Sequence, residues 1–146
     1  MGPPLVILIP VFNDQPAVTA LLPKLDTALA ERGFRGDIWF VDDGSTIPLA
    51  DAWSPSEFHS LQEVRVLRLR RNTGHQRAIA IGLAYLDENV HPQAVVIMDA
   101  DGEDAPRDVP LLLERLRERQ GPCIFAERMR RSEGPLFSFF YWLYRL

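Results

Sequence analysis

An alternation of short apolar runs with longer stretches of helical period constrains the fold most strongly. The apolar runs predict strands at Leu5–Val11, Asp37–Val41, Val64–Leu69 and Ala94–Met98, with a candidate fifth at Cys123–Ala126. The helical stretches predict helices at 16–32, Gly74–Asn89 and Arg107–Gln120, and an aromatic-rich helix at Leu136–Leu146. This order is typical of βαβ units, so we expect an open α/β fold with a mainly parallel sheet flanked by helices.

Two stretches depart from this regular pattern. Helix 16–32, which Asp14 or Asn13 can cap, contains Pro23, and a proline in a helix interior predicts a kink or an interruption there. Residues 47–62 carry two prolines and little period, which indicates an irregular connection with at most a short helix.

Composition excludes several classes of protein. A chain of 146 residues fits one domain, and 16 basic against 20 acidic residues leave no basic footprint for nucleic acid. Cys123 is the single cysteine, which rules out an intrachain disulfide and favours a reducing, cytoplasmic setting. The apolar run Leu5–Ile9 is too short for a signal peptide, and no stretch is long enough to span a bilayer. We therefore expect a soluble or peripheral protein.

Polar residues follow each of the first four predicted strands. These segments are Pro10–Asp14, Asp42–Ser45, Arg71–Gln76 and Asp99–Asp104. Ligands of open α/β sheets bind outside the carboxyl ends of the strands, so we expect the four segments to form one site.

Asp99 and Asp101 indicate a metal ion. If this segment is extended, both side chains point to one side and Ala100 points away. Hard oxygen ligands of this kind suit Mg²⁺ or Mn²⁺, which also bind phosphate oxygens. Two such aspartates without a further motif more often belong to a solvated loop. The preceding apolar strand and the second acidic pair, Asp42 and Asp43, favour the metal site here.

The other polar positions have structural as well as functional interpretations. Asp42–Ser45 can be a turn whose side chains bond to the backbone. His75 can be a surface residue in a first helical turn, although the free N–H groups near Gly74 also suit a diphosphate. Arg128 can be a solvated charge, or it can neutralise a leaving diphosphate.

Four blocks of sequence, in this order, resemble those of the family 2 glycosyltransferases with the GT-A fold. The blocks are IPVFND, VDDGST, RRNTGHQRAIAIGL and VVIMDADGEDAP. The GHQ run within the third block is similar to that of the polyprenyl-phosphate glycosyltransferases, which include the dolichol-phosphate mannose synthases.

The resemblance implies a nucleoside-diphosphate sugar donor, a divalent metal and a set of site residues. Pro10, Phe12 and Asp14 would line the nucleoside pocket, and Val41 with Asp42 or Asp43 would read the base or ribose. Asp99, Ala100, Asp101 and Arg128 would hold the diphosphate, with Asp99, Asp101 and Arg128 as the catalytic groups. Glu103 would join Asp99 and Asp101 as a third metal ligand.

The chain departs from the pattern of this family at several positions. Phe12 stands where Tyr is usual, Asp14 replaces Glu, and Gly102-Glu103 replaces Leu-Gln. The family domain also continues further. We therefore interpret residues 1–134 as the nucleotide-sugar-binding part of a domain whose C-terminal part is missing. Residues 135–146 are predicted to form an interfacial helix at a membrane surface, against the alternative of a core helix without its partner.

The expected function is inverting transfer of a hexose from a UDP- or GDP-sugar to a polyprenyl phosphate, at the cytoplasmic face of the membrane. One alternative is a family 2 transferase with a saccharide or other hydroxyl acceptor, and another is a truncated, non-catalytic nucleotide-binding module. A phospho-acceptor signalling domain is disfavoured, because its acidic pair would follow the first strand. Neither the P-loop nor the dinucleotide-binding glycine pattern occurs.

Overall fold

The computed structural model describes residues 4–49, 58–119 and 124. Its elements in chain order are β1 (Leu5–Val11), α1 (Gln15–Glu31), β2 (Gly36–Asp42), β3 (Leu61–Arg68), α2 (His75–Asn89), β4 (Ala94–Ile97) and α3 (Asp108–Arg119). The strands form one four-stranded sheet in the order β3-β2-β1-β4, and every pairing in it is parallel. The expected open α/β fold is therefore confirmed.

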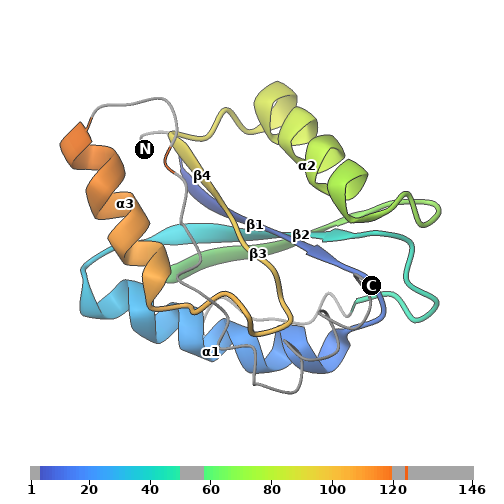
Figure 1. Ribbon diagram of the computed structural model, residues 1–146, viewed down its shortest axis with the longest axis horizontal. Coiled ribbons are helices and arrows are strands. Elements are labelled where there is room, and N and C mark those ends of the chain that lie inside the picture. Colours follow the sequence, from blue (N-terminus) through green and yellow to red (C-terminus); the bar gives the residue numbers. More distant parts are fainter. Residues whose placement is uncertain (1–3, 50–57, 120–123, 125–146) are drawn as a thin grey trace, which may run out of the picture.

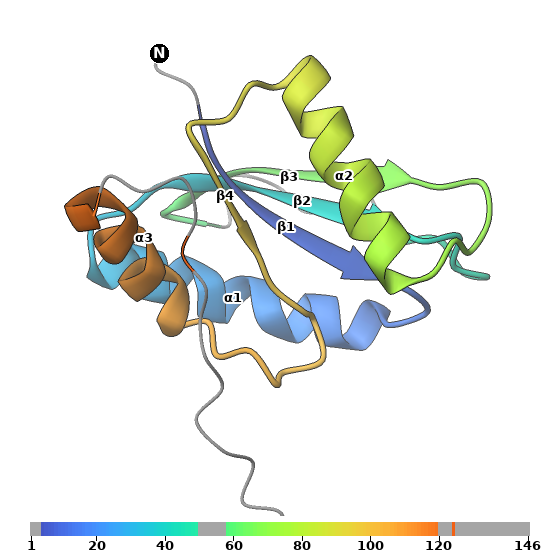
Figure 2. The same cartoon turned by 45° about the horizontal axis from the view of Figure 1, so that its top comes forward.

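Helices cover both faces of the sheet (Figure 1). Figure 2 shows α1 and α3 on one face and α2 on the other. Successive residues of β1 point to opposite faces, so Ile7 and Ile9 pack into the core beneath α1, whereas Val6 and Leu8 pack into the core beneath α2. Burial on both faces explains why β1 reads as a continuous apolar run rather than an alternating one.

Helix α1 continues through Pro23, so the predicted interruption is wrong. The Asp14 side chain caps the helix by accepting a hydrogen bond from the Ala17 backbone N–H at 3.2 Å. Proline removes one backbone hydrogen bond, but Pro23 lies on the exposed side of the helix, where water can satisfy the orphaned carbonyl. Burial of the apolar stripe on the opposite side, which includes Leu22 and Leu25, offsets the cost.

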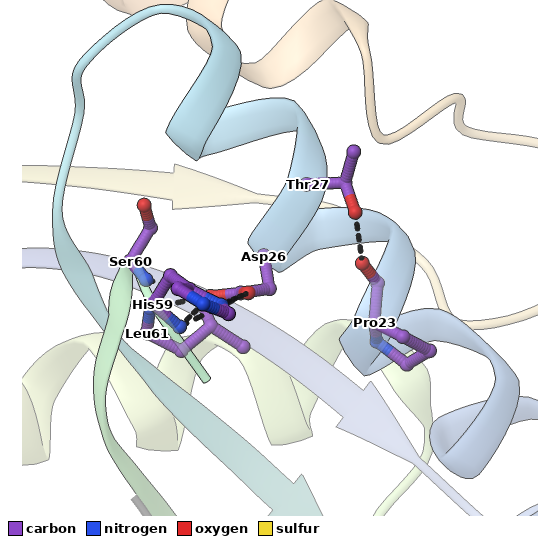
Figure 3. Close-up of polar contacts among 6 residues, drawn as sticks. All are labelled: Pro23, Asp26, Thr27, His59, Ser60 and Leu61. Carbon is purple, nitrogen blue, oxygen red and sulfur yellow. Dashed lines mark hydrogen bonds and ion pairs between the residues drawn. The ribbon is translucent and has the colours of Figure 1, made fainter. Parts of the chain in front are cut away.

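Strand β3 begins three residues earlier than the sequence predicted, at Leu61 rather than Val64. The cause is Asp26, a carboxylate on the buried side of α1 that is only 8% exposed. Asp26 Oδ1 accepts hydrogen bonds from the backbone N–H groups of His59, Ser60 and Leu61 at 3.0, 2.7 and 3.0 Å (Figure 3). These bonds fix the chain where it enters the sheet beside β2.

The pKa of Asp26 reflects two opposing effects. Burial raises it, but the hydrogen bonds from Ser60, Leu61 and His59, together with attraction to the His59 side chain, lower it further than burial raises it. The net result is a pKa below the ordinary value, so the ionised carboxylate is the form that stabilises the fold.

Several predictions concern residues outside the described part of the chain. They include the helix Leu136–Leu146, the strand Cys123–Ala126 apart from Ile124, and the division of the chain at residue 134. No helix in the described part of the chain is long and apolar enough to cross a bilayer.

Replacing Asp26 by Asn should lower the free energy of unfolding by about 2 kcal/mol at pH 7, because hydrogen bonds to a charged acceptor are lost. The stabilisation is fully present above the unfolded-state pKa of 3.8 and disappears as the pH falls through the lower folded-state value. Urea unfolding at pH 7 and pH 3 measures the difference. The control is Asp87→Asn, at an exposed position of α2. Equal losses in the two variants at pH 7 would disprove the stabilising role of Asp26.

Replacing Gly82 of α2 by Ala should destabilise the protein by about 1 kcal/mol, although alanine favours helices. The added methyl would lie 2.7 Å from Val41 Cγ2 and 2.9 Å from Leu8 Cδ1, both in the core. Chemical denaturation measures the effect. Ala84→Gly, at an exposed position of the same helix, measures how much the difference in helix propensity between alanine and glycine contributes on its own. A Gly82→Ala variant more stable than the parent would contradict the close packing of α2 on the sheet.

Candidate functional site

The four predicted segments meet at one edge of the sheet, because all four strands run in the same direction. The arrowheads of the strands in Figure 2 mark this edge. The strand order reverses at β1, which has β2 on one side and β4 on the other. Such a reversal is where open α/β sheets bind ligands, so this edge is the candidate site.

Hydrogen bonds join the segment after β1 to the segment after β2. The Asn13 backbone N–H donates to Ser45 Oγ at 2.9 Å. In return, the Thr46 backbone N–H and hydroxyl donate to Asn13 Oδ1 at 2.8 and 2.9 Å. Asn13 has a positive φ of 55°, which asparagine tolerates better than most residues. The two loops therefore form one connected rim.

Asp42, at the end of β2, is 2% exposed and shapes the loop that follows it. Its Oδ1 accepts a hydrogen bond from the Ser45 backbone N–H at 3.0 Å, and its Oδ2 accepts one from that of Leu49 at 3.1 Å. This agrees with the turn interpretation of the sequence. Contact of Asp42 with a base or ribose remains a prediction.

Asp43 connects β2 to the beginning of α2. Asp43 is buried, with only 3% of the residue exposed. Oδ1 accepts hydrogen bonds from the Thr73 backbone N–H at 2.8 Å and hydroxyl at 2.7 Å, and Oδ2 accepts one from the Gly74 backbone N–H at 2.9 Å. A buried carboxylate with three donors is well satisfied. Asp43 therefore fixes the residues that lead into α2.

The close approach of these loops explains the glycine in the second block. Gly44 has a φ of 73°, and a Cβ there would lie 2.5 Å from the carbonyl carbon of Arg71 and 2.6 Å from the nitrogen of Asn72. Both neighbours are backbone atoms, which cannot move aside without displacing the loop. Only glycine fits at this crossing.

The segment after β4 folds back on itself and contacts α2. The Asp99 backbone N–H donates to Asp104 Oδ2 at 2.9 Å, and the Glu103 backbone N–H donates to Asp101 Oδ1 at 2.9 Å. His75, the first residue of α2, places Nε2 3.4 Å from Asp99 Oδ1. The third and fourth blocks of sequence are thus in direct contact.

The side chains of this loop offer carboxylate oxygens, the kind of ligand that Mg²⁺ and Mn²⁺ prefer. Asp101 and Glu103 are exposed and Asp99 is about one-third exposed, so solvent reaches all three. Within residues 4–49, 58–119 and 124, no three side chains of His, Cys, Asp or Glu are grouped to hold a metal ion. Mg²⁺ commonly binds proteins through one or two carboxylates and takes its other ligands from phosphates and water. Asp99 and Asp101 would meet that requirement, while Glu103 stays a predicted third ligand.

The residues predicted for the nucleoside pocket differ in their exposure. Phe12 is 47% exposed at the end of β1, where its ring is available for stacking. Pro10 and Val41 are buried, and Val41 packs beneath α2. Asp14 caps α1, and Ala100 packs against the core beneath α1. Arg128 lies outside the described residues.

The sequence did not predict the contacts that Asn13, Thr73 and His75 make between loops. The three side chains join loops that are far apart in the chain, and their partners, such as Thr46 and Asp99, follow from the strand order. The available signal was the placement of each residue directly beyond a predicted strand, which identified the segments but not the contacts between them.

The chain belongs to the family 2 glycosyltransferases. A family model described as "Glycosyl transferase family 2" matches residues 6–144, which is nearly the whole chain. The parallel sheet with helices on both faces is the Rossmann-like arrangement expected for the GT-A fold, so the resemblance of the four blocks is confirmed at the level of family and fold.

Several curated proteins are similar to this chain. An undecaprenyl-phosphate 4-deoxy-4-formamido-L-arabinose transferase of Klebsiella pneumoniae is 30% identical over 112 residues, covering 77% of this chain and 33% of the relative. A dodecaprenyl-phosphate galacturonate synthase of Rhizobium johnstonii is 27% identical over 131 residues, covering 89% of this chain and 37% of the relative. The chain spans about a third of the length of these relatives. The names of both relatives refer to a polyprenyl phosphate, undecaprenyl phosphate in the first and dodecaprenyl phosphate in the second.

Replacing Asp43 by Asn should lower the free energy of unfolding by about 2 kcal/mol, because the amide nitrogen of asparagine cannot accept the bonds that the carboxylate accepts. Asp101→Asn, at an exposed position of the same edge, should change it by less than about 0.5 kcal/mol. Urea denaturation of both variants measures the difference. Similar stability of the two variants would show that the Asp43 contacts contribute little.

Proposed function

We propose that this chain is the donor-binding part of a metal-dependent glycosyltransferase that moves a sugar from a UDP- or GDP-sugar to a polyprenyl phosphate. The observation that carries the proposal is the meeting of the four strand-end segments at one edge, with exposed carboxylates after β4 and an exposed Phe12 after β1. Membership of the family and the polyprenyl phosphates in the relatives' names support the substrate classes.

The donor would lie across the ends of β1, β2 and β4. Phe12 would stack on the nucleoside, whose ring offers a flat apolar face. Asp42 and Asp43 have their carboxylate oxygens bonded within the protein, so they would shape the pocket more than contact the donor. Asp99 and Asp101, with Glu103 nearby, would face the diphosphate.

A diphosphate beside two carboxylates needs positive charge between them. Asp99 and Asp101 would hold Mg²⁺ or Mn²⁺, which supplies Lewis-acid stabilisation of the departing diphosphate. Arg128 would add a second positive group on the diphosphate, as the resemblance implies.

The transfer itself would be a single displacement. An oxygen of the acceptor phosphate forms a bond to the anomeric carbon, while the bond from that carbon to the donor's diphosphate oxygen breaks and its electron pair leaves with the nucleoside diphosphate. The configuration at the anomeric carbon inverts. A phosphate acceptor is already anionic, so this step needs no general base. A hydroxyl acceptor would need one.

A polyprenyl phosphate resides in a membrane, so the acceptor would reach the site from a bilayer surface. We place this surface at the cytoplasmic face, where nucleotide sugars are available. The aromatic segment 135–146 would lie in the interface with its apolar side chains.

Calorimetric titration of UDP and GDP, each with and without Mn²⁺, tests the donor site. We expect one nucleotide to bind in a metal-dependent manner, and Asp101→Asn to weaken that binding by about 100-fold, since a direct ligand contributes at least as much as its supporting groups. Asp87→Asn, on an exposed part of α2, is the matched control. Unchanged binding by folded Asp101→Asn would overturn the assignment of the metal site.

The acceptor is tested by incubating the chain with a labelled donor and either a polyprenyl phosphate or a free saccharide. Product on the lipid phosphate supports the proposal, whereas product on the saccharide alone supports a hydroxyl acceptor. Metal-dependent nucleotide binding without transfer to either acceptor would identify a binding module.

A further inference from the structure

The contact between His75 and Asp99 joins the beginning of α2 to the loop after β4. Nε2 of His75 lies 3.4 Å from Asp99 Oδ1, with the histidine side chain about half exposed and the aspartate about one-third exposed. The two residues are 24 positions apart in the chain: His75 begins α2, which packs on β1 and β2, and Asp99 follows β4, the neighbour of β1 in the sheet. The contact therefore depends on the fold, which brings the start of α2 to the loop after β4.

The position of His75 is fixed by residues on a third element. Thr73 and Gly74 donate their backbone N–H groups to Asp43 at 2.8 and 2.9 Å. Gly74, the N-cap residue of α2, has a φ of 91°, a conformation that glycine adopts without strain. His75 follows directly, so the imidazole is attached to backbone that the buried Asp43 carboxylate holds in place.

Asp99 and Asp101 are supported differently. The backbone of Asp99 is held through its N–H by Asp104, and its carboxylate lies beside His75. Asp101 Oδ1 accepts a hydrogen bond from Glu103, which belongs to the same loop. The His75 contact reaches the Asp99 carboxylate from another element, α2, so it can hold this side chain in a fixed orientation.

We propose that His75 is a positioning residue that orients the Asp99 carboxylate for the metal and diphosphate, with Asp43 holding the backbone that carries it. This role rests on the proposed function. Groups that hold a ligating carboxylate in place commonly contribute 10- to 100-fold, roughly, to metal affinity or activity. His75→Ala should therefore weaken Mn²⁺ binding in the presence of the nucleotide by about 10- to 100-fold.

The first measurement tests the contact in the metal-free protein. The chain contains three histidines, His59, His75 and His91, whose ring resonances can be followed by NMR with labelled histidine. Asp99→Asn should shift the resonances of His75 and leave those of His59 and His91 in place. Unshifted His75 resonances would overturn the inference, whatever the chain binds.

The second measurement compares Mn²⁺ affinity, at saturating UDP or GDP, among variants of the complete 146-residue chain. His75→Gln keeps an N–H donor at about the reach of Nε2 and should retain most of the affinity, whereas His75→Ala and the shorter His75→Asn should lose it. Asp87→Asn, at an exposed position near the other end of α2, is the control. Thermal unfolding without metal confirms that each variant is folded.

The outcomes separate this inference from the proposed function. Loss of affinity in His75→Ala and recovery in His75→Gln support the positioning role. Parent-like affinity in His75→Ala overturns it while leaving the donor site in place. If the parent binds neither Mn²⁺ nor a nucleotide, the proposed function fails and the positioning role fails with it, although shifted His75 resonances would still establish the contact.

Discussion

Parallel pairing of β1 with β2 on one side and with β4 on the other is the constraint on which the rest of this structure depends. β1 is buried on both faces, so its side chains contribute to the core beneath α1 and to the core beneath α2. Apolar burial of this extent is the main source of stability in a small domain. Because the three strands run in one direction, the loops that follow them reach the same edge. The polar side chains of these loops are therefore gathered at one candidate site.

Carboxylates gathered at one edge repel one another unless donors or cations compensate them. The protein uses two solutions. Asp42 and Asp43 are buried, and their oxygens accept hydrogen bonds from backbone N–H groups and from the Thr73 hydroxyl. Asp101 and Glu103 are exposed to water. The buried pair gives the edge its shape, and the exposed carboxylates after β4 are the groups that we propose to bind a cation.

The same principle operates at the opposite end of the strands. Asp26 accepts backbone N–H groups where the chain enters β3, as Asp43 does where the chain enters α2. In both places a carboxylate from one element fixes the start of another. Side-chain acceptors therefore help to hold these two connections, and such contacts between distant residues leave no periodic pattern in the sequence.

Local sequence determined the type and approximate bounds of the described helices and strands, because apolar periodicity records which side of each element is buried. It also identified the edge that carries the polar segments, since that edge follows from parallel strands. The tertiary structure decided the rest. Burial of Leu22 and Leu25 kept α1 continuous through Pro23, and Asp26 moved the start of β3 to Leu61. The contact of His75 with Asp99 at 3.4 Å likewise joins residues distant in sequence, which come together because parallel strands carry their following loops to the same edge.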